Sequence, residues 1–190
     1  MTPLSPVAPT RTPPRPERPF AREAKTCDQK NPALASSTLV RQMRAMAPLP
    51  TYDQIRDDFS FLDNWEDRYR YVMELGRALP PLDEQLRTDQ NKVRGCASQV
   101  WLASRVIGDQ GARTLHFDGD SDAHLVRGLV AILFVLVQDR TPAAILAVDP
   151  HAAFAELGLG EHLTPQRSNG FASMVARVRA DAVAAVAAGP

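Results

Sequence analysis

The pattern of apolar and polar residues divides the chain into two parts that meet close to Met46. Upstream of this point the apolar residues recur at neither helical nor strand spacing, whereas downstream they follow both periods in turn. A segment without such periodicity cannot bury enough apolar surface to offset the entropy that folding removes. We therefore expect residues 1–48 to be disordered and residues 49–190 to form one folded domain.

Two helices are predicted at the start of the folded part. Thr51, with a glutamine three residues later, has the sequence of a capping box, which predicts a helix from the next residue to Leu62. Asn64 or Asp63 would then cap a second helix over Trp65–Arg77, whose apolar residues again recur at helical spacing. Two consecutive prolines follow this second helix and end it.

A long loop and a β-hairpin are predicted next. The segment Leu82–Arg94 is polar and irregular, which is typical of a loop. Gln99–Ile107 is rich in β-branched and aromatic residues, so we expect a strand there. Gly108–Gly111 predicts a hairpin turn, and the alternating segment Arg113–Phe117 predicts the second strand. We expect Gly119–Ser121 to end that strand.

The remainder of the chain predicts helices. Ser121 is expected to cap a long helix that runs to Val137, with Asp122 in its first turn, where the helix dipole favours a negative charge. Three pairs of an N-cap residue and a proline predict further helix starts, the last of which begins a helix to about Ala187: Thr141–Pro142, Asp149–Pro150 and Thr164–Pro165. The fold class is therefore α+β, a single compact domain with a small antiparallel sheet packed against several helices.

The N-terminal segment differs from the rest in composition. Half of the sixteen prolines lie before Met46, together with eight basic and three acidic residues. Arginines with few acids are partly typical of an organellar transit peptide, but clustered proline opposes the amphipathic helix that such peptides form. A further alternative is that translation starts at Met43 or Met46, in which case the residues upstream are not part of the protein. Its basic residues are spread out, which argues against a lipid-binding arm.

Charge and cysteine content exclude several classes of function. Lys plus Arg and Asp plus Glu both number 22, so nothing indicates a nucleic acid or an anionic membrane as partner. The longest apolar run, Leu125–Val137, falls short of the ~20 residues that cross a bilayer. Two cysteines and four scattered histidines do not have the spacing of a zinc site. Without a secretory signal we expect the reducing cytoplasm, where a cysteine is either inert or a reactive thiol.

Cys96 is the residue that stands out as a candidate for chemistry. It follows Gly95 at the point where the polar loop enters the apolar strand, and glycine allows the tight backbone of a loop tip. Lys92 and Arg94 would favour the thiolate, while burial against apolar neighbours would oppose it. From the residues alone, Cys96 is either a functional thiol or a small hydrophobic residue of the core.

Four segments around and beyond this cysteine occur in an order that resembles the SufE family of sulfur acceptors: WEDRYRYVMELGR, GCASQVWL, GDSDAHLVRGLVAIL and HLTPQRSNGFASMV. The resemblance extends from about Tyr52 to Ala182 and so covers essentially the whole predicted domain. It implies the α+β architecture that SufE and IscU proteins share. It also implies a role in iron–sulfur cluster assembly.

The resemblance assigns expected roles to individual residues. Cys96 matches the cysteine that accepts sulfur, preceded by Gly95 at the loop tip. Arg167 matches an arginine near the cysteine loop and the desulfurase contact, and Asp122 matches a position beside the loop. Ala97 departs from the glutamine expected in many members, which removes a polar contact.

The implied function is that of a sulfurtransferase-like carrier. A cysteine desulfurase of the SufS type, which uses pyridoxal phosphate, would hand sulfur to Cys96 as a persulfide and be stimulated by this transfer. Sulfur would then pass to the SUF scaffold. We expect no cofactor and no metal on this chain, a monomer or weak homodimer, and a mobile loop that places Cys96 in an apolar pocket.

Three other functions compete with the carrier. The first is a regulator that binds the desulfurase without carrying sulfur, which the sequence leaves open. The second is an iron–sulfur scaffold, but a cluster needs about four ligands such as thiolates and the predicted domain has one cysteine. The third is a cysteine hydrolase or thiol peroxidase, for which no motif provides a base beside Cys96.

Overall fold

The computed structural model describes residues 48–108 and 113–188. The expectations for residues 1–47, which include Cys27, lie outside the described residues, as does most of the expected hairpin turn. Within the two described ranges, no helix combines the length and the apolar character that crossing a membrane requires.

The two helices predicted at the start of the domain are confirmed. Helix α2 spans Tyr52–Phe61, and the Thr51 capping box makes both of its reciprocal hydrogen bonds. Helix α3 spans Trp65–Ala78, and its cap is Asn64, whose side chain accepts from a backbone N–H in the first turn. The predicted boundaries therefore differ from the observed ones by one residue at each C-terminal end.

The long loop is confirmed, with the short 3₁₀ helix η1 at Glu84–Leu86 inside it, and the hairpin follows. Strands β1 (Val100–Ile107) and β2 (Thr114–Ser121) pair antiparallel. The prediction that Gly119–Ser121 ends the second strand was wrong. A Cβ on Gly119 would lie 2.7 Å from a Leu102 methyl carbon and 2.8 Å from the Phe134 ring, so glycine here marks close packing inside the strand.

The start of the next helix was also wrongly predicted. Helix α4 spans His124–Val137, and its N-cap is Ala123, which makes no side-chain capping bond. Ser121 is instead the last residue of β2, and its hydroxyl donates to the Gln99 carbonyl. Asp122 precedes the helix instead of lying in its first turn, and its carboxylate accepts a hydrogen bond from the Gln99 N–H in the loop before β1.

The three predicted N-cap and proline pairs are confirmed as the starts of α5 (Pro142–Ala147), α6 (Pro150–Glu156) and α8 (Pro165–Ala187). Side chains of Thr141 and Asp149 make capping hydrogen bonds. The short helix α7, Leu159–His162, was not predicted. It starts after Gly158, whose left-handed φ of 68° suits glycine.

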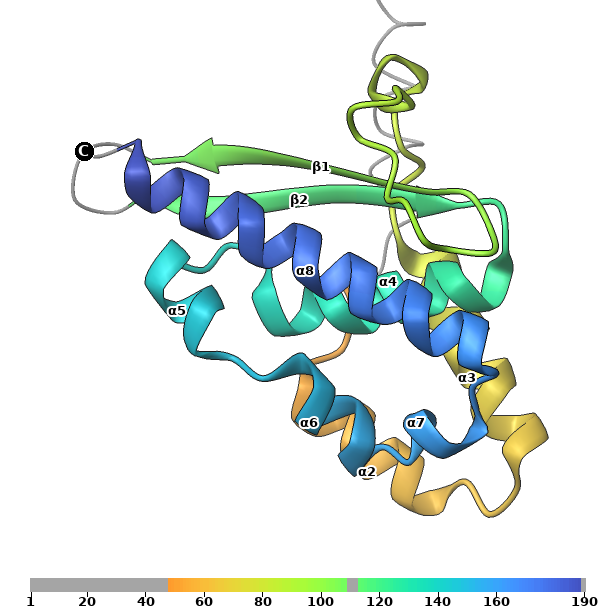
Figure 1. Cartoon of the computed structure of the whole chain (residues 1–190). Coiled ribbons are helices and arrows are strands. Elements are labelled where there is room, and N and C mark those ends of the chain that lie inside the picture. The colour runs from red at the N-terminus through yellow and green to blue at the C-terminus, as the bar shows by residue number, and fades with distance from the viewer. Residues whose placement is uncertain (1–47, 109–112, 189–190) are drawn as a thin grey trace, which may run out of the picture.

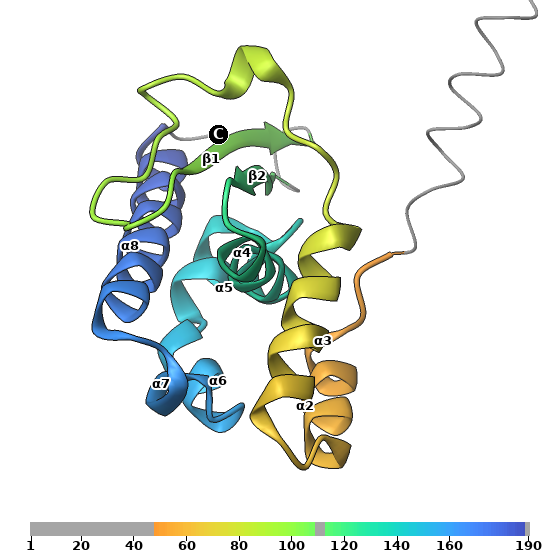
Figure 2. The same ribbon diagram turned by 90° about the vertical axis from the view of Figure 1, so that its right-hand side faces the viewer.

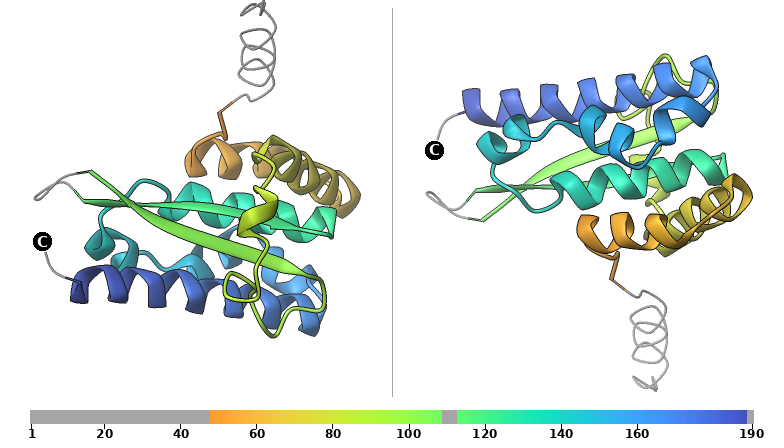
Figure 3. Two further views of the ribbon diagram at one scale, coloured as in Figure 1. Left: turned by 90° about the horizontal axis from the view of Figure 1, so that it is seen from above. Right: turned by 90° about the horizontal axis from the view of Figure 1, so that it is seen from below.

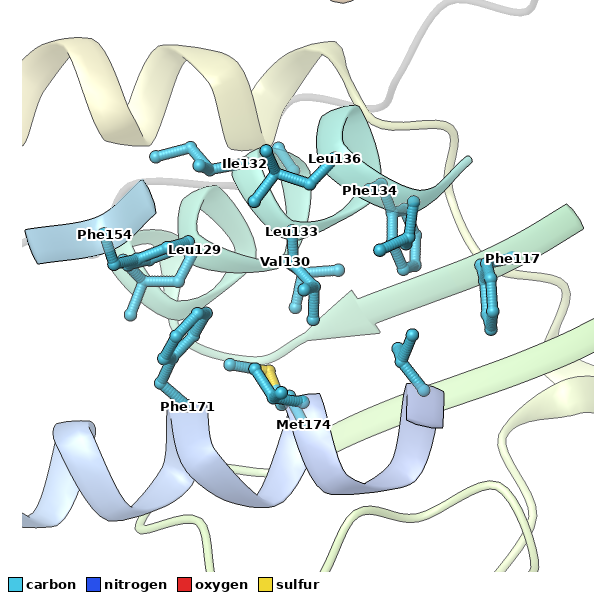
Figure 4. Packing of buried hydrophobic residues seen from close by; sticks show 14 of the residues in the cluster. Phe117, Leu129, Val130, Ile132, Leu133, Phe134, Leu136, Phe154, Phe171 and Met174 are labelled. Atoms are coloured by element: carbon cyan, nitrogen blue, oxygen red, sulfur yellow. The ribbon is translucent and has the colours of Figure 1, made fainter. Parts of the chain in front are cut away.

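Helix α4 forms the centre of the domain. Seen end-on in Figure 2, it lies beneath the hairpin, between α3 on one side and α8 on the other. The hairpin crosses above α4 and α8, as Figures 1 and 3 show. Figure 4 shows Phe171 and Met174 of α8 pointing toward Leu129 and Val130 of α4, and all four side chains are buried. The observed α+β domain thus agrees with the predicted fold class, and α8 has one face in the core.

Candidate functional site

Cys96 lies at the tip of a loop whose two ends are hydrogen-bonded to each other. The Val93 N–H donates to the Val100 carbonyl at 2.9 Å, and the Leu102 N–H donates to the Asn91 carbonyl at 2.8 Å. These bonds pair the segment before the loop with the start of β1, in the manner of a short third strand. The residues between Val93 and Val100 therefore form a short loop that projects from this pairing.

The C-terminal end of the loop is held a second time, at Gln99. Its N–H donates to the Asp122 carboxylate at 2.9 Å, and its carbonyl accepts the Ser121 hydroxyl at 2.9 Å. The structure thus places Asp122 beside the cysteine loop, joined to it by a charge-assisted hydrogen bond. Its side chain is exposed on the other side.

Gly95 has a backbone φ of 89°, a conformation that L side chains rarely adopt. A Cβ at this position would also lie 2.8 Å from the Ser173 hydroxyl oxygen on α8. Glycine is therefore required here both for the turn at the loop tip and for the close approach of the loop to α8.

The Cys96 thiol is half-buried against α8. Its Sγ lies 3.5 Å from the carbonyl oxygen of Gly170, within range of a weak S–H hydrogen bond. Next to it is a cavity of about 210 Å³ whose lining comes from the loop, α4 and α8: Ala97, Ser98, Ala123, Val126, Leu129, Gln166, Arg167, Phe171 and Met174. Most of these side chains are apolar, so the thiol faces a largely apolar cavity that is open to the surface.

Burial decides the electrostatics of Cys96, which the sequence had left open. Burial raises the pKa of the Cys96 thiol above its ordinary value. Lys92 donates to the Gln99 side chain at 3.3 Å, and Arg94 is exposed to solvent. Burial of Cys96 in this arrangement therefore disfavours the thiolate, which is the nucleophilic form of the thiol.

Arg167 lies in the first turn of α8 and lines the cavity beside Cys96. Its guanidinium is exposed, and no described side chain or carbonyl pairs with it. An arginine that no described residue pairs with, at the edge of such a cavity, is available to a carboxylate or another anionic group.

Other candidates for chemistry lie elsewhere or are engaged. Among the described residues, none of those lining the Cys96 cavity is a histidine, and no group of three metal-binding side chains occurs. His116 is hydrogen-bonded to Asp139 at 2.7 Å. A larger cavity of about 350 Å³ lies along β2 and shares no lining residue with the Cys96 cavity.

Sequence reasoning missed the residues of α8 that contact the loop. The helical pattern did not single out Gly170 or Ser173, although glycine in a helix interior is unfavourable and so signals a special contact. The apolar lining from α4 carried no separate signal, because core and cavity residues share the same helical spacing.

Comparison with known proteins gives a consistent result. Residues 53–182 match the family model described as "SufE: Fe-S metabolism associated domain". An uncharacterized SufE-like protein of Rhizobium etli is 54% identical over 140 residues, which cover 74% of this chain and 95% of that protein. An uncharacterized SufE-like protein of Rhizobium meliloti is 51% identical over 134 residues, covering 70% of this chain and 96% of its own length.

A solved structure shares the fold. The solution structure of a hypothetical protein from Thermus thermophilus superimposes with a TM-score of 0.58 at 22% identity. The match covers 74% of this chain and 99% of the solved chain. At this identity the likeness concerns the fold alone.

Proposed function

This chain belongs to the SufE family, which is linked to iron–sulfur metabolism, and from this premise we propose that it is a sulfur acceptor and carrier. Cys96 takes a sulfur atom from a cysteine desulfurase, becomes a persulfide and passes the sulfur to the SUF scaffold. We assign this function to the domain of residues 49–190.

The observation that carries the proposal is the position of the thiol. Cys96 lies at the tip of a loop that is hydrogen-bonded at both ends, half-buried beside an apolar cavity. A carrier has two requirements that conflict, because its sulfur must be reached by a partner and yet be shielded from reductants in between. A short loop over an apolar cavity meets both requirements if it opens when the partner docks.

The transfer is a thiol exchange that is balanced in atoms and electrons. The Cys96 thiol loses its proton, and the thiolate attacks the outer sulfur of the desulfurase cysteine persulfide. The bond between the two sulfurs of that persulfide breaks, and a new sulfur–sulfur bond forms on Cys96. The electron pair of the broken bond stays on the desulfurase cysteine as a thiolate, so no external oxidant is required.

Arg167 supports the docking step. Its guanidinium is exposed at the cavity edge and has no partner within the described chain. A desulfurase that presents a carboxylate or its negatively charged persulfide here would satisfy this charge and bring it close to Cys96. Pyridoxal phosphate belongs to the desulfurase, and the chemistry described for this chain uses only its own side chains.

The test is intact-protein mass spectrometry after incubation with a SufS-type desulfurase and free cysteine. The wild-type chain is expected to gain about 32 mass units per added sulfur, reversed by a thiol reductant, and Cys96→Ser is expected to gain none. The matched control is Cys27→Ser, which should be loaded like wild type. If the wild-type chain accelerates the desulfurase without gaining mass, it is a regulator and not a carrier.

A further inference from the structure

Two small residues on one face of α8 form the surface against which the cysteine loop packs. Gly170 and Ser173 are one helical turn apart, and we call this pair the loop seat. A Cβ on Gly170 would lie 3.2 Å from the Cys96 Sγ and 3.5 Å from the Cys96 Cα. A Cβ on Gly95 would lie 2.8 Å from the Ser173 Oγ. The loop and the helix therefore approach each other through positions with little or no side chain.

Glycine at position 170 is unfavourable for α8 itself. It lies inside the helix, where alanine would be the more stable choice, and the neighbouring exposed positions Ala172 and Ala176 are alanine. The three atoms nearest to a Cβ at this position all belong to Cys96. The contact that a side chain here would disturb is thus the one with Cys96.

At its tip the loop has few other contacts with the described residues that keep it closed. Its ends are fixed at Val93 and Val100, and again at Gln99, but the residues at the tip rest on the loop seat, and the thiol makes only a long hydrogen bond of 3.5 Å to the Gly170 carbonyl. The closed state therefore depends on the fit between the tip and the seat, because a single weak hydrogen bond contributes little.

We propose that Gly170 is a positioning residue: the absence of a side chain there lets the loop close over its cavity, and any larger side chain shifts the loop toward an open state in which Cys96 is exposed. This inference deepens the proposed function, since it states what controls access to the sulfur. A larger residue would make Cys96 easier to load and would also make the loaded sulfur easier for reductants to remove.

The experiment measures the alkylation rate of Cys96 by iodoacetamide in the full chain without any desulfurase, with peptide mapping to separate Cys96 from Cys27. The variants are Gly170→Ala and Gly170→Leu. The matched control is Gly160→Ala in α7, where a Cβ would meet no atom within 4 Å. Far-UV circular dichroism and thermal unfolding establish that each variant is folded.

Gly170→Leu is expected to raise the Cys96 alkylation rate by about tenfold or more, because overpacking the contact increases the population of the open loop. Gly170→Ala should raise the rate by about two- to threefold, since its closest contact, 3.2 Å to the Cys96 Sγ, needs only a small shift. Its thermal stability should not fall, because alanine favours the helix. Gly160→Ala should react at the wild-type rate.

A second readout separates positioning from a merely structural role. Opening the loop removes the burial that raises the Cys96 pKa, so the alkylation rate of Gly170→Leu should rise at a lower pH than that of wild type. Three cations of the loop and the cavity edge, Lys92, Arg94 and Arg167, favour the thiolate, and the Asp122 carboxylate beside the loop opposes it. All four charged groups are present in wild type and variant, so the difference between their pH profiles reports the change in burial. A variant that only loosens the fold would lower the unfolding temperature without this shift at temperatures where it is folded.

The inference fails if folded Gly170→Leu is alkylated at the wild-type rate with an unchanged pH profile. It also fails if Gly170→Leu does not fold and Gly170→Ala reacts like wild type and Gly160→Ala. These results are independent of sulfur transfer. If the Gly170 variants are alkylated faster but wild type forms no persulfide, the proposed function alone is overturned. If wild type forms the persulfide but substitution of Gly170 does not change alkylation, the role of the loop seat alone is overturned.

Discussion

Among the close contacts that glycines make in this domain, those of Gly128 and Gly170 differ in what lies opposite. Gly128 of α4 faces α3, where a Cβ would lie 2.1 Å from the carbonyl oxygen of Val72 and 2.7 Å from its carbonyl carbon. Gly170 of α8 faces the loop, where the nearest atom to a Cβ would be the Cys96 Sγ at 3.2 Å. The first contact joins two backbones inside the core, and the second joins a helix to a loop tip at the surface.

The difference separates a fixed part of the molecule from the loop that we propose can open. Neither α3 nor α4 can yield at Gly128 without separating the two helices and opening the core between them. The loop can yield at Gly170 by rotating one side chain or lifting its tip, while its ends stay bonded at Val93 and Val100. We therefore expect the interface at Gly128 to be permanent and the interface at Gly170 to be reversible.

The largest effect is expected from Gly128→Ala. The added Cβ would overlap the Val72 backbone, so we expect the free energy of unfolding to fall by about 3 kcal/mol. Urea denaturation followed by circular dichroism measures this loss, with Gly160→Ala as the control. A loss below about 1 kcal/mol would mean that the helices can separate locally, and the α3–α4 contact would then be no more rigid than the loop contact.

An intermediate and more local effect is expected from Gly95→Ala. The left-handed φ of 89° and the contact with Ser173 both oppose a Cβ, at a cost of about 1 kcal/mol. Because the loop can lift, we expect the loss to appear as faster amide hydrogen exchange between residues 94 and 98, with little change in α3 and α4. Adding Ser173→Gly should restore part of the protection by removing the steric contact and leaving the φ strain. Faster exchange in α3 and α4 as well would contradict a reversible loop contact.

The smallest expected effect is on the pH dependence of the folding stability. Burial raises the Cys96 pKa, so the folded state keeps the thiol proton to a higher pH than the unfolded chain does. This contribution to stability is fully present below the thiol pKa of the unfolded chain, and it is lost as the pH rises through the folded pKa. Wild type should therefore lose slightly more stability than Cys96→Ser as the pH rises above about 8, the range in which an unperturbed thiol begins to ionise.

The measurement is the difference in unfolding temperature between wild type and Cys96→Ser at each pH. Burial and acidic hydrogen-bond partners also raise the pKa of Tyr52 and Tyr71, but these groups titrate in both proteins and cancel in the difference. Equal pH slopes for the two proteins would show that the thiol is already solvated, and hence that the loop is open in solution.

The elements that the sequence predicted well are those whose signals are local. The Thr51 capping box and the proline-headed α5, α6 and α8 are determined by residues within one turn, and each was predicted at its observed start. The end of β2 was missed because Gly119 is there for contacts with Leu102 and Phe134, which are distant in sequence.

The candidate site was predictable only in part, because some of its contacts are local in sequence and others join distant segments. The position of Cys96 at a loop tip followed from its neighbours in sequence, because a glycine and a polar stretch precede it and an apolar strand follows. Ser121 was expected to cap a helix but donates to Gln99, since the loop offers a competing acceptor that only the folded chain brings near. The seat on α8 and the cavity likewise arise from segments that meet only in the tertiary structure.

The hydrogen bond between Val93 and Val100 also sets how far the sulfur can travel. Cys96 is the third residue after Val93, so a fully extended loop reaches about 10 Å from its anchor. A sulfur atom on so short an arm cannot be passed between two proteins that are bound to different faces of the domain. Under the proposed function, donor and recipient must therefore each bind at the same end of α8, and one must leave before the other arrives. The sulfur delivery that we propose for this protein would then proceed by alternating encounters, with the carrier bound to neither partner between them.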